Sequence, residues 1–282
     1  MGEINRFSAH QFTDQTNLTF SPEMYSKFKF GCKDVARKFG TELAEKFINS
    51  LYFQNIVRQS INYDKRIVVF SSPYVHIPTA TFAMKDYFIR VLNNALIENG
   101  CEPVLECKIY RKSSYKEEYG EMNKEERFKI MEADSFYVDE TFIKDKIRIF
   151  LDDIVITGAH EYRVLRMLKQ AGMDEMPNIY NYFLYFAELT SHETNPVIEN
   201  YLNYYFVKDL VSLDKIIKNE EHLINTRTVK YILNAPFEEC KTFLSYQKDS
   251  FVHTLYHQAI GNGYHKIEDY VSNLNLIKSM LQ

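Results

Sequence analysis

The sequence lacks the features that would place the protein in a membrane, on a secretion pathway or on nucleic acid. Its 282 residues contain no apolar run that approaches the length of a membrane span, and no apolar stretch follows a basic start at the N-terminus. We therefore expect no membrane partner and no signal peptide. The formal net charge is only −4, which provides no strong field to attract nucleic acid, so any phosphate recognition must be local.

Three further absences narrow the class of protein. None of the four cysteines (Cys32, Cys101, Cys107 and Cys240) belongs to a C-x-x-C pair, which in a chain of this size predicts reduced thiols and a cytoplasmic location. No Gly-Lys-Ser/Thr triplet occurs, so a Walker-type phosphate loop is excluded. Tryptophan is missing, although tyrosine and phenylalanine each occur 21 times, and we interpret this as a bias of composition rather than a special aromatic surface.

The residues that are present are typical of a globular protein, with 45% hydrophobic and 26% charged side chains. Short β-branched runs bounded by turn residues predict strands, and apolar residues at helical spacing predict helices. The expected strands are residues 65–70, 103–111, 146–151, 178–189 and 201–207. Helices are expected over residues 34–51, 81–99 and 160–170, and residues 1–20 are interpreted as loop.

Strand and helix alternate from about residue 65 to residue 210, which favours an α/β fold with a central parallel sheet flanked by helices. We therefore predict an N-terminal helical segment (1–62), an α/β core (63–212) and a C-terminal helical region (213–282). Residues 112–135, which are dense in charge and tyrosine, are expected to form an exposed flap between the second and third strands.

One segment, Ile147 to Glu161, carries the residue types that suit a sugar phosphate. An apolar strand leads into two adjacent acids, Asp152 and Asp153, which are followed by three apolar residues, a Thr-Gly pair and the start of a helix. Carboxylates between apolar stretches are costly to desolvate unless something pairs with them. The carboxyl end of a strand in an open α/β sheet is where ligands bind, and the N-terminus of the following helix favours a phosphate. The segment therefore predicts acids that hold hydroxyls beside a turn that holds phosphate.

This pattern resembles the ribose-phosphate binding signature of type I phosphoribosyltransferases, and the order of strands and helices is also as that family would have it. The resemblance implies that Asp152 and Asp153 hold the ribose hydroxyls, with Mg²⁺ bound through the ligand and waters rather than directly by the protein. It assigns the 5-phosphate to a loop of four residues, Thr157, Gly158, Ala159 and His160.

The same resemblance implies a pyrophosphate loop after the first strand, from Ser71 to His76, in which Ser71 and Ser72 would donate hydrogen bonds. Lys29 and Arg111 are the basic residues that we interpret as candidate pyrophosphate contacts. Arg111 opens the expected flap, which in this family closes over the reaction centre and excludes water.

The sequence departs from the family pattern in three places. His160 stands where a small hydroxyl residue is usual, and the loop from Ser71 lacks the glycine and the basic residue often found there. Ile156 stands where purine-using members have an aspartate that exchanges a proton with the base. We therefore expect an acceptor other than a 6-oxopurine.

Two other kinds of site are set aside on spacing. A phosphatase of the haloacid dehalogenase type needs a second aspartate two positions after the first, where this chain has Ile154 and Val155. His253 and His257 lie four residues apart but lack the glutamate of a metalloprotease motif, so we interpret them as surface or packing residues.

The leading hypothesis is an enzyme that transfers a 5-phosphoribosyl group between pyrophosphate and a nitrogenous acceptor, with phosphoribosyl diphosphate or a nucleotide as its small-molecule partner. The resemblance also implies a homodimer. A second hypothesis is a non-catalytic protein of the same fold that senses phosphoribosyl diphosphate or a nucleotide. A purely structural interaction module would leave the two acids unexplained.

Overall fold

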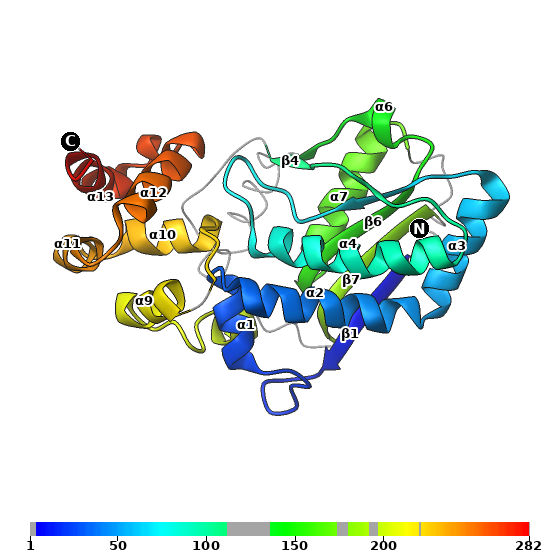
Figure 1. The fold of residues 1–282 in the computed structure, drawn as a ribbon, viewed down its shortest axis with the longest axis horizontal. Helices are drawn as coiled ribbons and strands as arrows, with labels where there is room; N and C mark the ends of the chain where they lie inside the picture. The colour runs from blue at the N-terminus through cyan, green and yellow to red at the C-terminus, as the bar shows by residue number, and fades with distance from the viewer. Residues whose placement is uncertain (1–3, 112–135, 174–179, 192–196, 220, 282) are drawn as a thin grey trace.

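The computed structural model describes residues 4–111, 136–173, 180–191, 197–219 and 221–281, and the structural statements below refer to these residues. At the centre is a parallel sheet in the order β1-β7-β6-β2-β3 (Figure 1). Its strands are β1 (Asn5–Phe12), β2 (Ile67–Phe70), β3 (Leu105–Glu106), β6 (Ile147–Val155) and β7 (Asn181–Leu189). A separate antiparallel ribbon joins β4 (Tyr110–Arg111) to β5 (Phe136–Tyr137). The expected α/β class with a parallel sheet is confirmed.

The middle strands are apolar because helices cover both of their faces. All four residues of β2 are buried, as are most residues of β6 and β7, and such two-sided burial is typical of parallel sheets. On one face, α2 and α4 pack against each other and against the sheet, while α7 packs on the other face (Figure 1). The helices before β7 are α1 (Pro22–Lys29), α2 (Lys33–Ile48), α3 (Leu51–Tyr63), α4 (Ala80–Glu98), α6 (Glu140–Ile143) and α7 (Ala159–Gln170).

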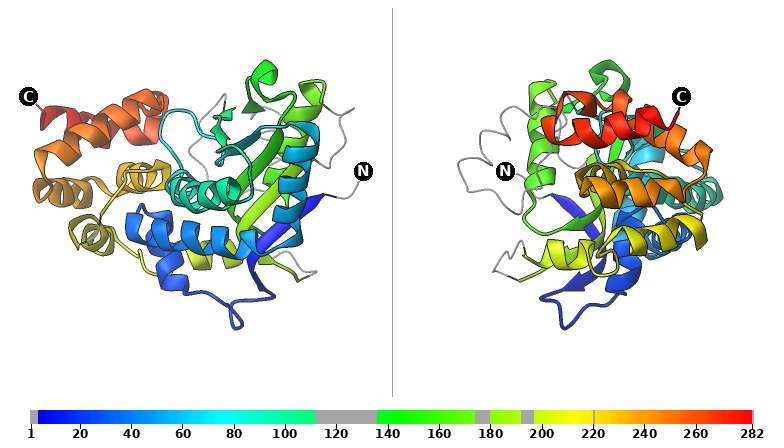
Figure 2. Two further views of the ribbon diagram at one scale, coloured as in Figure 1. Left: turned by 45° about the vertical axis from the view of Figure 1, so that its right-hand side comes forward. Right: turned by 90° about the vertical axis from the view of Figure 1, so that its left-hand side faces the viewer.

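Helices follow the sheet to the end of the described chain and lie together at one end of the molecule, beside α1 (Figures 1 and 2). They are α8 (Val197–Asn203), α9 (Leu210–Asn219), α10 (Thr226–Asn234), α11 (Phe237–Ser245), α12 (Asp249–Gly261), a 3₁₀ turn (Tyr264–Lys266) and α13 (Glu268–Ser279). The division of the chain into three segments at residues 62 and 212 stays a prediction.

Three predictions of secondary structure are wrong. Residues 1–20 are not all loop, because β1 pairs along its length with β7. The sequence of β1 does not predict a strand because many of its side chains are polar, as suits a strand at the edge of a sheet. Residues 201–207 are not a strand, because α8 ends at Asn203 and buries Ile198 and Leu202 on one helical face. The expected strand 103–111 is reduced to the short β3 and β4 at the edge of the sheet and in the ribbon.

Within the described ranges, no helix combines the length and the hydropathy that a membrane span requires.

Candidate functional site

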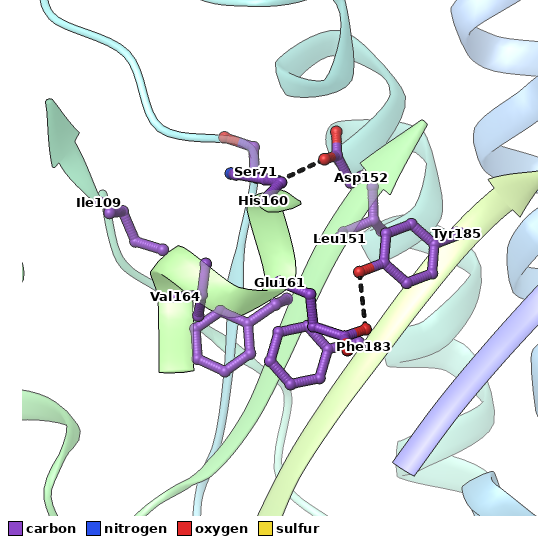
Figure 3. Close-up of a pocket in the computed structure, with 10 residues that line it drawn as sticks. Ser71, Ile109, Leu151, Asp152, His160, Glu161, Val164, Phe183 and Tyr185 are labelled. Carbon is purple, nitrogen blue, oxygen red and sulfur yellow. Dashed lines mark hydrogen bonds and ion pairs between the residues drawn. The ribbon is translucent and has the colours of Figure 1, made fainter. Parts of the chain in front are cut away.

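The acid pair lies within β6, and the strand alternation sends its two side chains to opposite faces of the sheet. On the α7 face, one carboxylate oxygen of Asp152 accepts hydrogen bonds from Ser72 Oγ at 2.6 Å and Thr81 Oγ1 at 3.4 Å. Its other oxygen lies 2.5 Å from Nδ1 of His160 (Figure 3). The predicted acid, the predicted loop after β2 and the predicted phosphate loop therefore meet at one carboxylate.

Electrostatics favour an ionised Asp152. Burial alone would raise the pKa of this carboxyl, but the facing His160 and the hydrogen bonds from His160 and Ser72 hold the pKa well below its usual range. The Asp152 side chain retains 15% exposure. It is therefore a partly accessible anionic acceptor at the carboxyl end of a central strand, where ligands bind in this class of fold.

Asp153 faces the other side of the sheet and is engaged by the protein itself. Its carboxylate accepts hydrogen bonds from the Tyr25 hydroxyl and from Lys29 Nζ, the latter at 2.6 Å, and its side chain is only 7% exposed. Burial, followed by the nearby Asp153, raises the pKa of Tyr25 well above its usual value, so Tyr25 stays a phenol that can donate. The structure thus places Lys29 on Asp153, and a pyrophosphate contact by Lys29 stays a prediction.

The four residues predicted to hold phosphate form the start of α7. Gly158 is the N-cap and has φ of 70°, a left-handed conformation that glycine adopts without strain. The Ala159 N–H donates to Thr157 Oγ1 at 3.3 Å. Because the first N–H groups of a helix have no acceptor within the helix and face the positive end of its dipole, this turn suits an anion.

A buried ion-pair network supports this turn, and sequence reasoning missed it. Both carboxylate oxygens of Glu161 accept hydrogen bonds from Arg6 of β1, at 2.8 and 3.0 Å, and one also accepts from the Tyr185 hydroxyl at 3.1 Å. Arg6 bonds Glu188 as well, at 3.1 Å. The Glu161 hydrogen bond, opposed by burial, raises the pKa of Arg6 overall. The network places a cation beside a buried carboxylate on the first turn of α7. Because the sequence pattern of residues 1–20 indicates a loop, nothing in the sequence points to Arg6 as a partner of Glu161.

A small pocket lies between α7 and the sheet. It is lined by residues that include Ser71, Asp152, His160, Glu161 and Tyr185 (Figure 3). Ser71 is itself buried and lies next to Ser72 in the loop between β2 and α4. The Asp152 carboxylate and the first turn of α7 therefore line the same pocket.

Arg111 lies on β4. Its backbone N–H donates a hydrogen bond to the carbonyl of Tyr74, in the loop after β2, at 3.4 Å. The remainder of the expected flap, residues 112–135, lies outside the described residues. A role for Arg111 at pyrophosphate stays a prediction.

His253, His257 and the four cysteines do not line this pocket. The imidazoles of His253 and His257 are exposed on α12, with ring centroids 6.4 Å apart. In the part of the chain that the structure describes, no three His, Cys, Asp or Glu side chains gather to hold a metal. Cys32, Cys101 and Cys240 are buried thiols, and burial raises the pKa of Cys240 to about 12.

Comparison with known proteins agrees with the fold. No curated protein matches the chain. A family model described as PRTase ComF-like matches residues 4–277, which include the sheet, the acid pair, the start of α7 and nearly all of the C-terminal helices. The chain therefore belongs to the PRTase ComF-like family, a family of the phosphoribosyltransferase type.

Proposed function

We propose that this protein binds a 5-phosphoribosyl group at the carboxyl ends of β2 and β6 and transfers it between pyrophosphate and a nitrogenous acceptor. The observation that carries the proposal is the Asp152 carboxylate, which is held by Ser72 and His160 and shortly precedes the start of α7 in the chain. Membership of the family supports it.

Different residues contact different parts of the ligand. Asp152 accepts hydrogen bonds from the ribose hydroxyls, and residues 157–160 donate backbone N–H groups to the 5-phosphate. His160, whose side chain is 30% exposed, lies between these two parts and can donate to the phosphate as well as contact Asp152. Arg6 pairs with the nearby Glu161, which reduces the repulsion between that carboxylate and the phosphate.

The protein contributes position rather than covalent chemistry. In the transfer, the bond from the anomeric carbon to the pyrophosphate oxygen breaks and pyrophosphate leaves with the electron pair. The acceptor nitrogen forms the new bond with its lone pair, and any proton it carries passes to the departing pyrophosphate or to water. Holding the phosphoribosyl group and the acceptor nitrogen together in fixed places makes the step effectively unimolecular. Ile156 packs against the core and has no proton to exchange with a base, which supports an acceptor other than a 6-oxopurine.

Mg²⁺ is the cofactor that this chemistry implies, and the residues fit an ion held mainly by its ligand. Mg²⁺ prefers oxygen ligands and keeps several waters, binding through one or two carboxylates and substrate phosphates. Asp152 lines the pocket and supplies such a carboxylate, which would hold the ion through its bound waters. When bound, the ion would neutralise charge on the diphosphate and so favour its departure.

A non-catalytic sensor of phosphoribosyl diphosphate is the second candidate, and the geometry of Asp153 favours it. Tyr25 and Lys29 already occupy that carboxylate, so only one acid of the pair faces the pocket. A sensor needs one carboxylate to recognise the sugar, whereas the resemblance assigns both acids to the ribose.

Turnover separates the two candidates. Purified protein is mixed with phosphoribosyl diphosphate, Mg²⁺ and a panel of nitrogen nucleophiles, and release of pyrophosphate is measured. The proposal predicts release that depends on one acceptor and that falls at least about a hundredfold in Asp152→Asn. Asp64→Asn is the matched control, because Asp64 is exposed before β2 at the opposite end of the sheet. Ligand binding without release by any acceptor would favour the sensor.

A further inference from the structure

The loop between β2 and α4, residues 71–79, is held by the C-terminal helical region (213–282). The Asn262 side-chain oxygen accepts the N–H groups of both His76 and Ile77, each at 3.0 Å. Thr226 Oγ1 donates to the Ile77 carbonyl at 2.8 Å, and the Thr226 N–H donates to the Pro78 carbonyl at 3.0 Å. Two residues of one region therefore fix backbone groups on three consecutive residues of the loop.

These contacts are internal to the molecule. Asn262 is only 4% exposed, and the loop reaches the C-terminal helices in both Figure 1 and the left view of Figure 2. Gly261 permits the approach, since a Cβ built there would come within 2.4 Å of the His76 ring. A buried amide that accepts two backbone donors is costly to replace by an apolar side chain, because both donors then lose their partner.

The same region also fixes the backbone at Lys29. Asn225 caps α10 by accepting the Thr228 N–H at 3.0 Å, and its amide group donates to the Lys29 carbonyl at 3.0 Å. Lys29 in turn bonds Asp153, just as Ser72 of the loop bonds Asp152. Each acid is thus contacted by a side chain from a segment held by the C-terminal region: Lys29 is held at its own carbonyl, and Ser72 lies in the loop that is held at residues 76–78.

We propose that Asn262 is a positioning residue, which sets the loop so that Ser72 holds Asp152 ready for the ligand. The C-terminal helical region is then a part of the binding site rather than a separate module. For its ligand, this inference rests on the proposed function. The physical reason is preorganisation: a loop fixed before the ligand arrives loses no conformational freedom on binding.

The test compares variants of the full-length protein by amide hydrogen exchange over residues 71–79 and by calorimetric titration with phosphoribosyl diphosphate and Mg²⁺. Asn262→Leu removes the acceptor, and Asn262→Asp keeps an oxygen that can accept both N–H groups. Asn273→Leu is the matched control, because Asn273 is a buried asparagine of the same region that donates to the Leu233 and Ala235 carbonyls, at 3.0 and 2.8 Å. Among the described residues, its side chain has no hydrogen bond to the loop.

We expect exchange in the loop to rise at least about tenfold in Asn262→Leu and ligand affinity to fall by a similar factor. Asn262→Asp should restore both to within about threefold of the wild type. Asn273→Leu should lower the stability of the C-terminal helices without changing either quantity.

The two proposals fail in different ways. Unchanged loop exchange in Asn262→Leu, or equal changes in Asn273→Leu, would overturn the positioning role whether or not the ligand binds. A wild-type protein that does not bind phosphoribosyl diphosphate would overturn the proposed function, while the exchange comparison still decides whether Asn262 holds the loop.

Discussion

Replacing Arg6 by methionine removes the cation that neutralises Glu161 beside the start of α7, while keeping a side chain of similar length. The two guanidinium hydrogen bonds to Glu161, at 2.8 and 3.0 Å, are lost, and only the Tyr185 hydroxyl at 3.1 Å remains. The Glu161 side chain is 5% exposed, so water cannot replace the lost partner without a rearrangement.

The cost can be worked from this geometry. Breaking a buried ion pair by removing one partner destabilises a protein by about 3–5 kcal/mol. Because the Arg6 side chain is 35% exposed, solvent already screens part of the interaction. We therefore expect the free energy of unfolding to fall by about 2 kcal/mol, as measured by urea denaturation with an unchanged m-value.

A double-mutant cycle measures how much of this loss comes from leaving Glu161 charged without its partner. Adding Glu161→Gln to Arg6→Met should recover at least about 1 kcal/mol, because glutamine removes the unpaired charge and can still accept from Tyr185. Arg37→Met is the matched control, since Arg37 is 59% exposed and pairs with an exposed aspartate, so it should cost at most about 0.5 kcal/mol. Equal costs for Arg6→Met and Arg37→Met, or no recovery in the double variant, would refute the account of the network.

Other perturbations test the acid pair and the phosphate turn. Because the pKa of Asp152 lies below its usual value of 3.8, its ionisation stabilises the fold above about pH 4, and this stabilisation is lost as the pH falls through the lowered pKa. As the pH falls from about 5 to about 2, the free energy of unfolding of Asp152→Asn, measured by denaturation curves, should therefore decrease less than that of the wild type. An equal decrease in the two proteins would contradict this. Lys29→Met should lower the free energy of unfolding by about 3 kcal/mol, since Asp153 is buried. Lys218→Met, in a more exposed ion pair on a helix surface, should lower it by about 0.5 kcal/mol or less, and similar losses would count against a buried pair. Ala159→Asp should weaken binding of phosphoribosyl diphosphate about tenfold without lowering stability, because an acid suits a helix start but repels phosphate there; unchanged affinity would place the phosphate elsewhere.

Much of the central fold could be predicted from sequence because its signals are local. The apolar runs of β2, β6 and β7 and the Thr157-Gly158 turn into α7 each lie within about ten residues, and parallel strands read as continuous apolar segments. β1 could not be predicted, because a half-buried strand at the edge of a sheet needs few apolar residues. Nothing in its own sequence therefore distinguishes it from a loop.

The surroundings of the acids could not be predicted because the contacts join distant parts of the chain. Arg6 meets Glu161 across 155 positions, and Asn262 meets His76 across 186. Such pairs are set by the packing of whole elements, and no periodicity in the sequence records them. The strand alternation that separates Asp152 from Asp153 was available from the sequence, but the partners on each face were not.

The most direct test of the central claim is calorimetric titration of the wild-type protein, Asp152→Asn and Asp64→Asn with phosphoribosyl diphosphate, with and without Mg²⁺. We expect the wild type to bind in a metal-dependent manner in the micromolar range, about −8 kcal/mol, and we expect Asp64→Asn to retain this binding and Asp152→Asn to lose it. Absence of binding by the wild type, or equal affinity in Asp152→Asn, would contradict a phosphoribosyl site at this carboxylate.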